Sequence, residues 1–154
     1  MDVSINLSGQ DREEICEILA NVLANTYILF LKTQNFHWNV TGSDFFSYHK
    51  MFEEQYEELF DAIDVLAERI RALGLYAEGS FSAFLKRGFI EEEKEIHPAK
   101  EMIIRLIKDH EKIISYLRDH LPRVEKLHDG ATSDLINKRL DVHEKAAWML
   151  RSHV

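Results

Sequence analysis

The sequence is poor in cysteine, proline and glycine, with one, two and six of them in 154 residues. Cys16 is the only cysteine, so no disulfide can form within the chain, which suits a reducing compartment. So few prolines and glycines argue against a sheet protein with many turns, and long stretches rich in Leu, Ile, Ala, Glu and Lys favour helices. We therefore expect an all-α protein with a single domain over residues 1–154.

The sequence also lacks the features of a targeting or membrane-spanning segment. No Lys or Arg precedes Arg12 and no apolar run follows it, which argues against a secretory signal. The most apolar stretch, residues 18–31, is interrupted by Asn21 and Asn25 and is shorter than the roughly 20 residues that span a bilayer. We expect no membrane span and a cytoplasmic location.

Positive charge is scarce relative to negative charge. The formal net charge is -8 at pH 7. This excess of acid argues against a surface that binds phosphate groups and suits a protein that attracts cations.

Hydrophobic periodicity predicts two long helices in the first half of the chain. Ser8, with Asp11 three positions later, is typical of a helix start, and apolar residues then recur at three- and four-residue steps over residues 9–38. Thr41–Asp44 has the composition of a turn. A second amphipathic helix begins near residues 44–48 and runs to Gly74.

The second half of the chain predicts two more long helices after a long connection. Residues 74–97 form this connection, with a possible short helix at 81–86. A third helix starts at Pro98, and Pro122 should kink or end it. The turn at 129–134 leads into a last helix capped by Thr132 or Asp129. Because the long connection lets helices two and three run parallel, we expect a ferritin-like four-helix bundle running up, down, down, up with one crossover.

Helix two carries two pairs of polar residues that could bind a metal. His49 and Glu53 are four residues apart, as are Asp64 and Glu68, so each pair projects from one side of the helix. The helix from His49 to Asp64 is about 22 Å long, so the two pairs cannot share a site within one chain. If two copies of this helix cross antiparallel on a two-fold axis, the His49 end of one meets the Asp64 end of the other. The turn at Gly42 could bring His37 beside His49.

Mixed imidazole and carboxylate ligands suit first-row metals such as iron better than Mg²⁺ or Ca²⁺. Taken singly, a histidine on an apolar helix face is more often packed in the core, and a glutamate on a helix flank is usually solvated. The combined spacing of the two histidines and the carboxylates favours a metal site.

Several short motifs resemble the signature of the Dps-like mini-ferritins, a family in the ferritin-like superfamily. They are HWNVTG at 37–42, Phe46, His49, Asp64 and the run Ala67-Glu68-Arg69. The turn DGATSD at 129–134 and the run WML at 148–150 extend the resemblance over the whole chain.

The resemblance implies a dodecameric shell that oxidises Fe(II), with hydrogen peroxide as the usual oxidant, and stores the ferric mineral. In this family the ferroxidase ligands lie at dimer interfaces. Carried over by position, they fall on His37, His49, Asp64 and Glu68, with Glu53 at a position that is usually acidic. Trp38 resembles a family aromatic that quenches oxidising equivalents. Such a shell would protect a cell against oxidative damage, and zinc could compete for the iron site.

Two departures from the family pattern affect what the resemblance implies. Many members that bind DNA have a Lys-rich amino-terminal tail, whereas no Lys or Arg precedes Arg12 here. We expect DNA binding only if divalent cations bridge the two negative surfaces. The acids that line the family's three-fold pores correspond to Asp129 and Asp134, but Gly130 stands where another acid is common.

Three other functions compete with this interpretation. A larger ferritin or another diiron enzyme would need Glu-x-x-His on two helices, and only Glu125 to His128 matches. A DNA-compacting protein with a net charge of -8 per chain would repel phosphate unless a divalent cation bridged the two. A purely structural helical oligomer would leave Asp64 and Glu68 as surface charge. The remaining histidines show no ligand spacing and are interpreted as core or surface residues: His97, His110, His120, His128, His143 and His153.

Overall fold

The computed structural model describes residues 3–154, and within this range it contains five helices and no strand. The helices are α1 (Gly9–Asn39), α2 (Phe45–Ala72), α3 (Phe81–Arg87), α4 (Ala99–Lys126) and α5 (Gly130–Arg151). The expectation of an all-α protein is confirmed, and each predicted helix is present.

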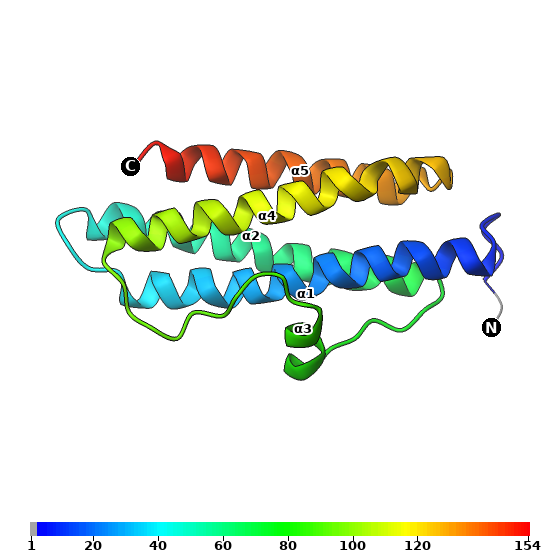
Figure 1. The fold of residues 1–154 in the computed structure, drawn as a ribbon, viewed down its shortest axis with the longest axis horizontal. Helices are drawn as coiled ribbons and strands as arrows, with labels where there is room; N and C mark the ends of the chain where they lie inside the picture. The colour runs from blue at the N-terminus through cyan, green and yellow to red at the C-terminus, as the bar shows by residue number, and fades with distance from the viewer. Residues whose placement is uncertain (1–2) are drawn as a thin grey trace.

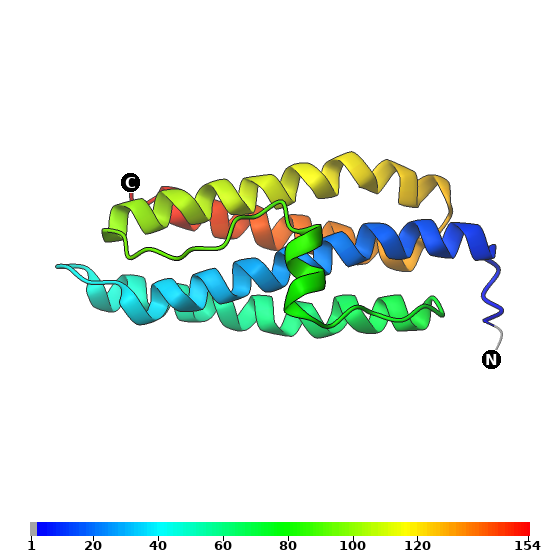
Figure 2. The same cartoon turned by 60° about the horizontal axis from the view of Figure 1, so that its bottom comes forward.

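The four long helices form a bundle in which α1 pairs with α2 and α4 pairs with α5 (Figure 1). Helices α2 and α4 run in the same direction, because the chain crosses the length of the bundle between them. The predicted order of up, down, down, up with one crossover is therefore confirmed. Figure 2 shows α3 lying crosswise to the long helices, beside α1.

Side-chain caps mark the starts of α1 and α5. The Ser8 side chain accepts a hydrogen bond from the backbone N–H of Asp11 and caps α1, as predicted. Asp129 caps α5 in the same way, through the N–H of Thr132. Pro122 lies inside α4, which continues to Lys126, so the helix does not end at this proline.

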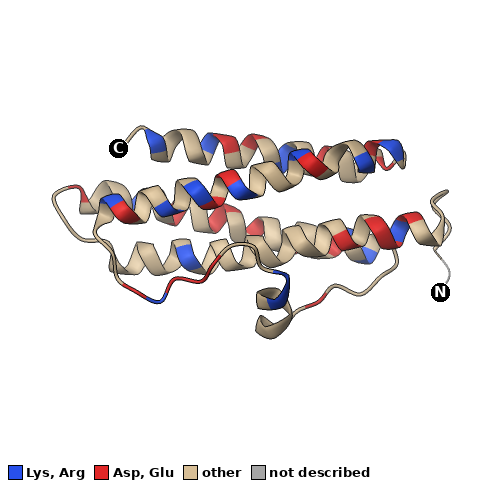
Figure 3. Cartoon of the chain, viewed as in Figure 1, with Lys and Arg blue, Asp and Glu red and all other residues tan. Residues whose placement is uncertain are grey.

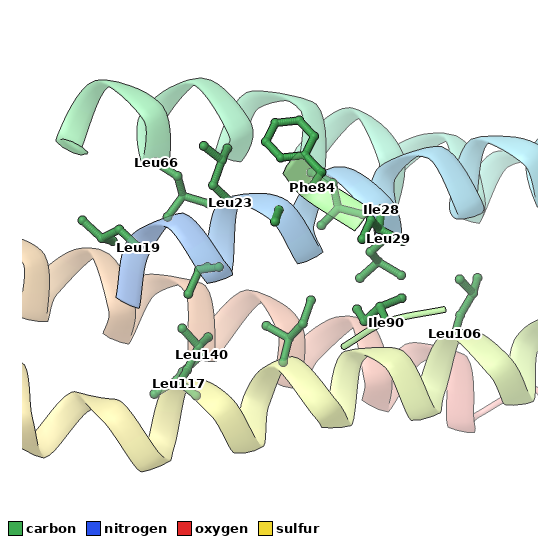
Figure 4. Close-up of a cluster of buried hydrophobic side chains, with 14 of the residues drawn as sticks. Leu19, Leu23, Ile28, Leu29, Leu66, Phe84, Ile90, Leu106, Leu117 and Leu140 are labelled. Carbon is green, nitrogen blue, oxygen red and sulfur yellow. The ribbon is translucent and has the colours of Figure 1, made fainter. Parts of the chain in front are cut away.

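The apolar core runs along the centre of the bundle. The middle of α1 carries no charged side chain (Figure 3) and contributes Leu19, Leu23 and Leu29 to the core. These side chains lie in one cluster with Leu66 of α2 and Leu106 of α4 (Figure 4). Among residues 3–154, α1 alone is long and apolar enough to cross a membrane, but 61% of its apolar window is buried in the bundle. The apolarity of α1 is thus explained by packing.

Asn25, fully buried in α1, holds the crossover against the bundle. Its side-chain oxygen accepts hydrogen bonds from the backbone N–H groups of Phe89 and Ile90, at 2.8 and 2.9 Å. Its amide nitrogen donates to the carbonyl oxygens of Asn21 and Arg87. One side chain thus satisfies two backbone N–H groups of a segment that has no regular structure.

Candidate metal centre

The turn between α1 and α2 places two histidine rings face to face. Gly42 adopts a φ of 121°, a conformation that L side chains rarely adopt, and the chain reverses direction there. The His37 and His49 ring centroids lie 3.8 Å apart, with 17° between the planes. The prediction that this turn brings His37 beside His49 is confirmed.

The two histidines fix each other through their main chains. The His37 Nδ1 donates a hydrogen bond to the carbonyl oxygen of His49, at 2.8 Å. The His49 Nδ1 donates to the carbonyl oxygen of His37, at 2.9 Å. A carbonyl oxygen only accepts, so each ring carries its proton on Nδ1, which leaves Nε2 of the neutral ring with a lone pair. This tautomer is the one that a histidine bound to a metal through Nε2 requires.

Aromatic side chains hold the two rings in place. Phe45 stacks on His49 with 5.0 Å between centroids, and Tyr56 meets His37 edge-on at 5.1 Å. His37 is 7% exposed, whereas Trp38, the next residue, is 62% exposed. His37 is therefore buried and His49 is partly exposed, in a partly apolar setting.

Glu53 is the carboxylate nearest this pair in the sequence, one helical turn after His49. It forms an ion pair with Lys50, with 2.5 Å between Nζ and Oε2. The hydrogen bond from Lys50 lowers the pKa of Glu53, and the charge of the ammonium adds to this effect. The structure thus brings two of the five predicted ligands, His37 and His49, into contact, whereas Glu53 pairs with Lys50. Lys50 was not predicted, although its three-residue spacing from Glu53 on a helix could have indicated the contact.

Asp64 and Glu68 lie far along the same helix from the histidines. Both are exposed, and α2 is continuous from Phe45 to Ala72. Within residues 3–154, no group of three or more His, Cys, Asp or Glu side chains lies close enough to hold a metal ion. The sequence argument that the two pairs cannot meet within one chain agrees with this geometry.

An exposed aromatic patch lies beside the histidine pair. From Tyr56, edge-to-face and tilted contacts continue through Phe30 to Phe60, and through Tyr27 to Phe81. Phe60 is 61% exposed and Phe81 is 67% exposed. Large aromatic side chains gathered at a surface are typical of a contact with another protein chain.

One predicted pore residue is placed differently in the structure. Asp129 is 4% exposed and accepts two hydrogen bonds from the Arg69 guanidinium, at 2.7 and 2.9 Å. Its carboxylate also accepts from Thr132 while capping α5. The interpretation of Asp129 as a solvent-facing pore acid is therefore wrong, because this carboxylate is used inside the subunit. Asp134 remains exposed.

A second histidine pair lies in the core between α4 and α5. His110 and His143 are 2% and 0% exposed, and their Nδ1 atoms are 2.9 Å apart. Arg139 donates to the Nε2 of His143 at 3.3 Å and also pairs with Glu58 of α2. The prediction that these histidines belong to the core or the surface is confirmed, but their pairing was missed.

Comparisons with known proteins identify the family to which this sequence and this fold belong. The Ferritin-like domain family matches residues 16–154. The chain therefore belongs to the ferritin-like family. An uncharacterised low temperature-induced protein of Nostoc sp. is 38% identical over 154 residues, covering 99% of this chain and 86% of that protein.

Other relatives place the chain within that family, among the Dps proteins. A DNA protection during starvation protein of Helicobacter pylori is 35% identical, covering 90% of this chain and 96% of that protein. A Dps crystal structure from Bacillus brevis has a TM-score of 0.91 at 31% identity, covering 96% of this chain and 99% of that one. A Dps protein from Vibrio cholerae, described as a ferritin-like diiron-carboxylate protein, has a TM-score of 0.93 at 31% identity, covering 99% and 96%.

Proposed function

We propose that this chain is a cytoplasmic ferroxidase that oxidises Fe(II) with hydrogen peroxide and stores the ferric product in a dodecameric shell. Each site is composite, with His37 and His49 from one subunit and Asp64 and Glu68 from its two-fold mate. Glu53 completes the ligand set beside the histidines. Removing Fe(II) and peroxide together would protect the cell from oxidative damage, and Zn²⁺ would compete for the same ligands.

The reciprocal bonds between His37 and His49 are the observation that carries this proposal. A structural histidine pair would use its ring nitrogens to satisfy each other or the core. Here both Nδ1 atoms donate to main-chain carbonyls, so both Nε2 lone pairs remain available to a cation. The exposed aromatic patch supports the second half of the proposal, because it offers a surface on which a second copy of the chain can pack.

The residues of the site have separable roles in the reaction. The two neutral imidazoles bind Fe(II) without adding charge, and Asp64 and Glu68 of the partner copy supply negative charge that stabilises the ferric product. Two Fe(II) ions give two electrons to one peroxide, which takes up two protons and becomes two water molecules. Trp38 is exposed, and we expect it to donate an electron to a stray oxidising species, as the family resemblance implies.

Mixed shells test the composite site. One variant carries His37→Ala and His49→Ala, and the other carries Asp64→Ala and Glu68→Ala. Each alone should lose rapid oxidation, by about a hundredfold or more. In a mixed dimer, the histidines of the second variant meet the carboxylates of the first and restore one of the two sites. Shells verified to contain both variants should regain activity, and persistent inactivity in such shells would reject the shared site.

The oxidant preference needs a separate measurement. Stopped-flow oxidation of Fe(II) at equal concentrations of peroxide and oxygen should show the faster reaction with peroxide. A faster reaction with oxygen would reject the preference and leave the ferroxidase activity intact.

DNA binding is the competing function suggested by relatives named for DNA protection. The net charge of -8 per chain would repel the phosphate backbone, and assembly of twelve chains would increase this repulsion. We expect no retardation of duplex DNA at physiological salt without added divalent metal. A gel shift measures DNA binding by the assembly, whose size is checked by sedimentation. A stable complex without added divalent metal would support DNA binding.

A further inference from the structure

A cavity of about 230 Å³ lies between α2, α4 and α5. Half of its lining is apolar and includes two methionines: Met51, Leu59, Val142, Ala146 and Met149. An apolar protein cavity of about 150 Å³ is large enough to bind benzene. The cavity between the three helices therefore has room for a small ring that carries a substituent.

Three buried polar atoms of the same lining have no hydrogen-bond partner within residues 3–154. They are the Oε1 and Nε2 of Gln55 and the Nε2 of His110. His110 is only 2% exposed, so bulk solvent does not replace the missing partner. A buried polar group without a partner costs free energy, and folded proteins nearly always supply one. Three such atoms at one cavity indicate that a polar molecule binds there.

The His110 ring contributes a hydrogen-bond donor to this lining. Arg139 donates to the Nε2 of His143 at 3.3 Å, so the neutral His143 ring carries its proton on Nδ1. That proton is donated to the Nδ1 of His110 at 2.9 Å, which leaves the proton of His110 on the unpartnered Nε2. The Gln55 amide adds one acceptor and one donor. A matching ligand must therefore accept a hydrogen bond and can also donate one.

The charged side chains of the lining favour a neutral ligand. Glu58 accepts a hydrogen bond at 3.0 Å from Arg139, which is buried, so the two charges are paired. Glu54 and Lys145 have opposite charges and are both exposed, so they mark the side of the cavity that meets solvent. An ion in this cavity would lose its hydration without gaining an unpaired countercharge among buried groups.

We propose that this cavity binds a small neutral phenol, whose hydroxyl pairs with the Nε2–H of His110 and with the amide of Gln55. A hydroxyl both accepts and donates, as these two side chains require. The ring packs on the apolar lining, where the thioethers of Met51 and Met149 make favourable contacts with aromatic rings. Water alone would satisfy the polar atoms and leave the apolar wall without a partner. The site shares no residue with the proposed metal centre, so either proposal can fail without the other.

The methionine methyl groups report binding to the intact assembly by nuclear magnetic resonance. Titration with phenol should shift the methyl signals of Met51 and Met149, because an aromatic ring lies against them. Met102 is fully buried on α4 and does not line the cavity, so its signal should stay in place. Unchanged signals of Met51 and Met149, or an equal shift of Met102, would overturn the proposal.

Toluene has the same ring without the hydroxyl and separates polar recognition from apolar packing. Gln55→Leu removes the unpartnered amide at similar size, so it should weaken phenol binding about tenfold and change toluene binding by less than about twofold. Gln10→Leu is the matched control at an exposed position near the start of α1 and should leave both affinities unchanged. The proposal is also overturned if Gln55→Leu changes both affinities by the same factor, or if Gln10→Leu weakens phenol binding as much.

Discussion

The two histidine pairs of this chain show how hydrogen-bond partners decide what a histidine can do. At the turn between α1 and α2, His37 and His49 each donate from Nδ1 to a main-chain carbonyl and keep Nε2 free. Between α4 and α5, His110 and His143 bond to each other, and Arg139 occupies the Nε2 of His143. The first pair keeps lone pairs available to a cation, whereas the second pair uses both Nδ1 atoms and the Nε2 of His143 in hydrogen bonds within the core.

The proton positions of the buried pair follow from Arg139. A guanidinium only donates, so the Nε2 of His143 must accept, and the neutral ring then carries its proton on Nδ1. That proton is donated to the Nδ1 of His110, whose own proton is left on Nε2. In this tautomer His110 has no lone pair available to a metal. The hydrogen bond from Arg139 thus leaves neither ring of this second pair with a free lone pair.

Of the substitutions considered for the two histidine pairs, replacement of the buried histidines should have the largest effect on stability. His143→Leu removes the donor to His110 and leaves a buried acceptor without a partner, which should cost about 2–3 kcal/mol in the free energy of unfolding. His110→Leu leaves the Nδ1–H of His143 unpaired and should cost about the same. The double variant removes both partners, so it should cost less than the sum of the single variants by about 1–2 kcal/mol.

Chemical denaturation of the single and double variants measures this coupling. Zn²⁺ affinity should stay unchanged in all three, because the pair does not belong to the proposed metal centre. If the losses in the free energy of unfolding are additive, the two rings do not depend on each other. If Zn²⁺ binding is lost, the buried pair also contributes to the metal centre.

The sequence predicted the fold and the first pair but not the second, and the reason is sequence distance. The helices follow from periodicity, and His37 meets His49 because a short turn with Gly42 joins their helices. His110 and His143 lie on separate helices, 33 residues apart, so their contact depends on the relative rotation of α4 and α5. No spacing rule within one helix contains that information.

The error at Asp129 has the same origin as the missed pair. Its burial depends on Arg69, 60 residues earlier on α2, which reaches the turn before α5. The sequence predicted Thr132 or Asp129 as the helix cap, and the structure shows Asp129 in that role. The sequence could not show that an ion pair across the bundle would also bury the carboxylate.

Acid should weaken the bundle through the buried pair, and the direction follows from the pKa shifts. Burial lowers the pKa of His110 to about 3 and also lowers that of His143. Unfolding restores an ordinary pKa near 6.5, so the unfolded chain binds more protons below that pH. The stabilising contribution is therefore complete above about pH 6.5 and is lost progressively as pH falls towards the folded-state pKa.

Protonation of His110 in the unfolded chain alone should lower the free energy of unfolding by about 2 kcal/mol at pH 5 relative to pH 7. The comparison is the pH dependence of the free energy of unfolding in the unmodified protein and in the His110→Leu, His143→Leu double variant, at a fixed protein concentration. The double variant should lose less stability between pH 7 and pH 5. Equal slopes would mean that other groups dominate acid unfolding.

The smallest effect should come from Phe45, which tests what holds the first pair. Its ring stacks on His49 at 5.0 Å but is 43% exposed, so Phe45→Leu should cost less than about 1 kcal/mol in stability. Zn²⁺ affinity should fall by less than about tenfold, because the main-chain bond from the Nδ1 of His49 still fixes the ring. Phe45→Tyr keeps the stacking and should match the unmodified protein. If Phe45→Leu weakens Zn²⁺ binding as severely as His49→Ala does, aromatic stacking and not the reciprocal main-chain bonds positions the imidazole.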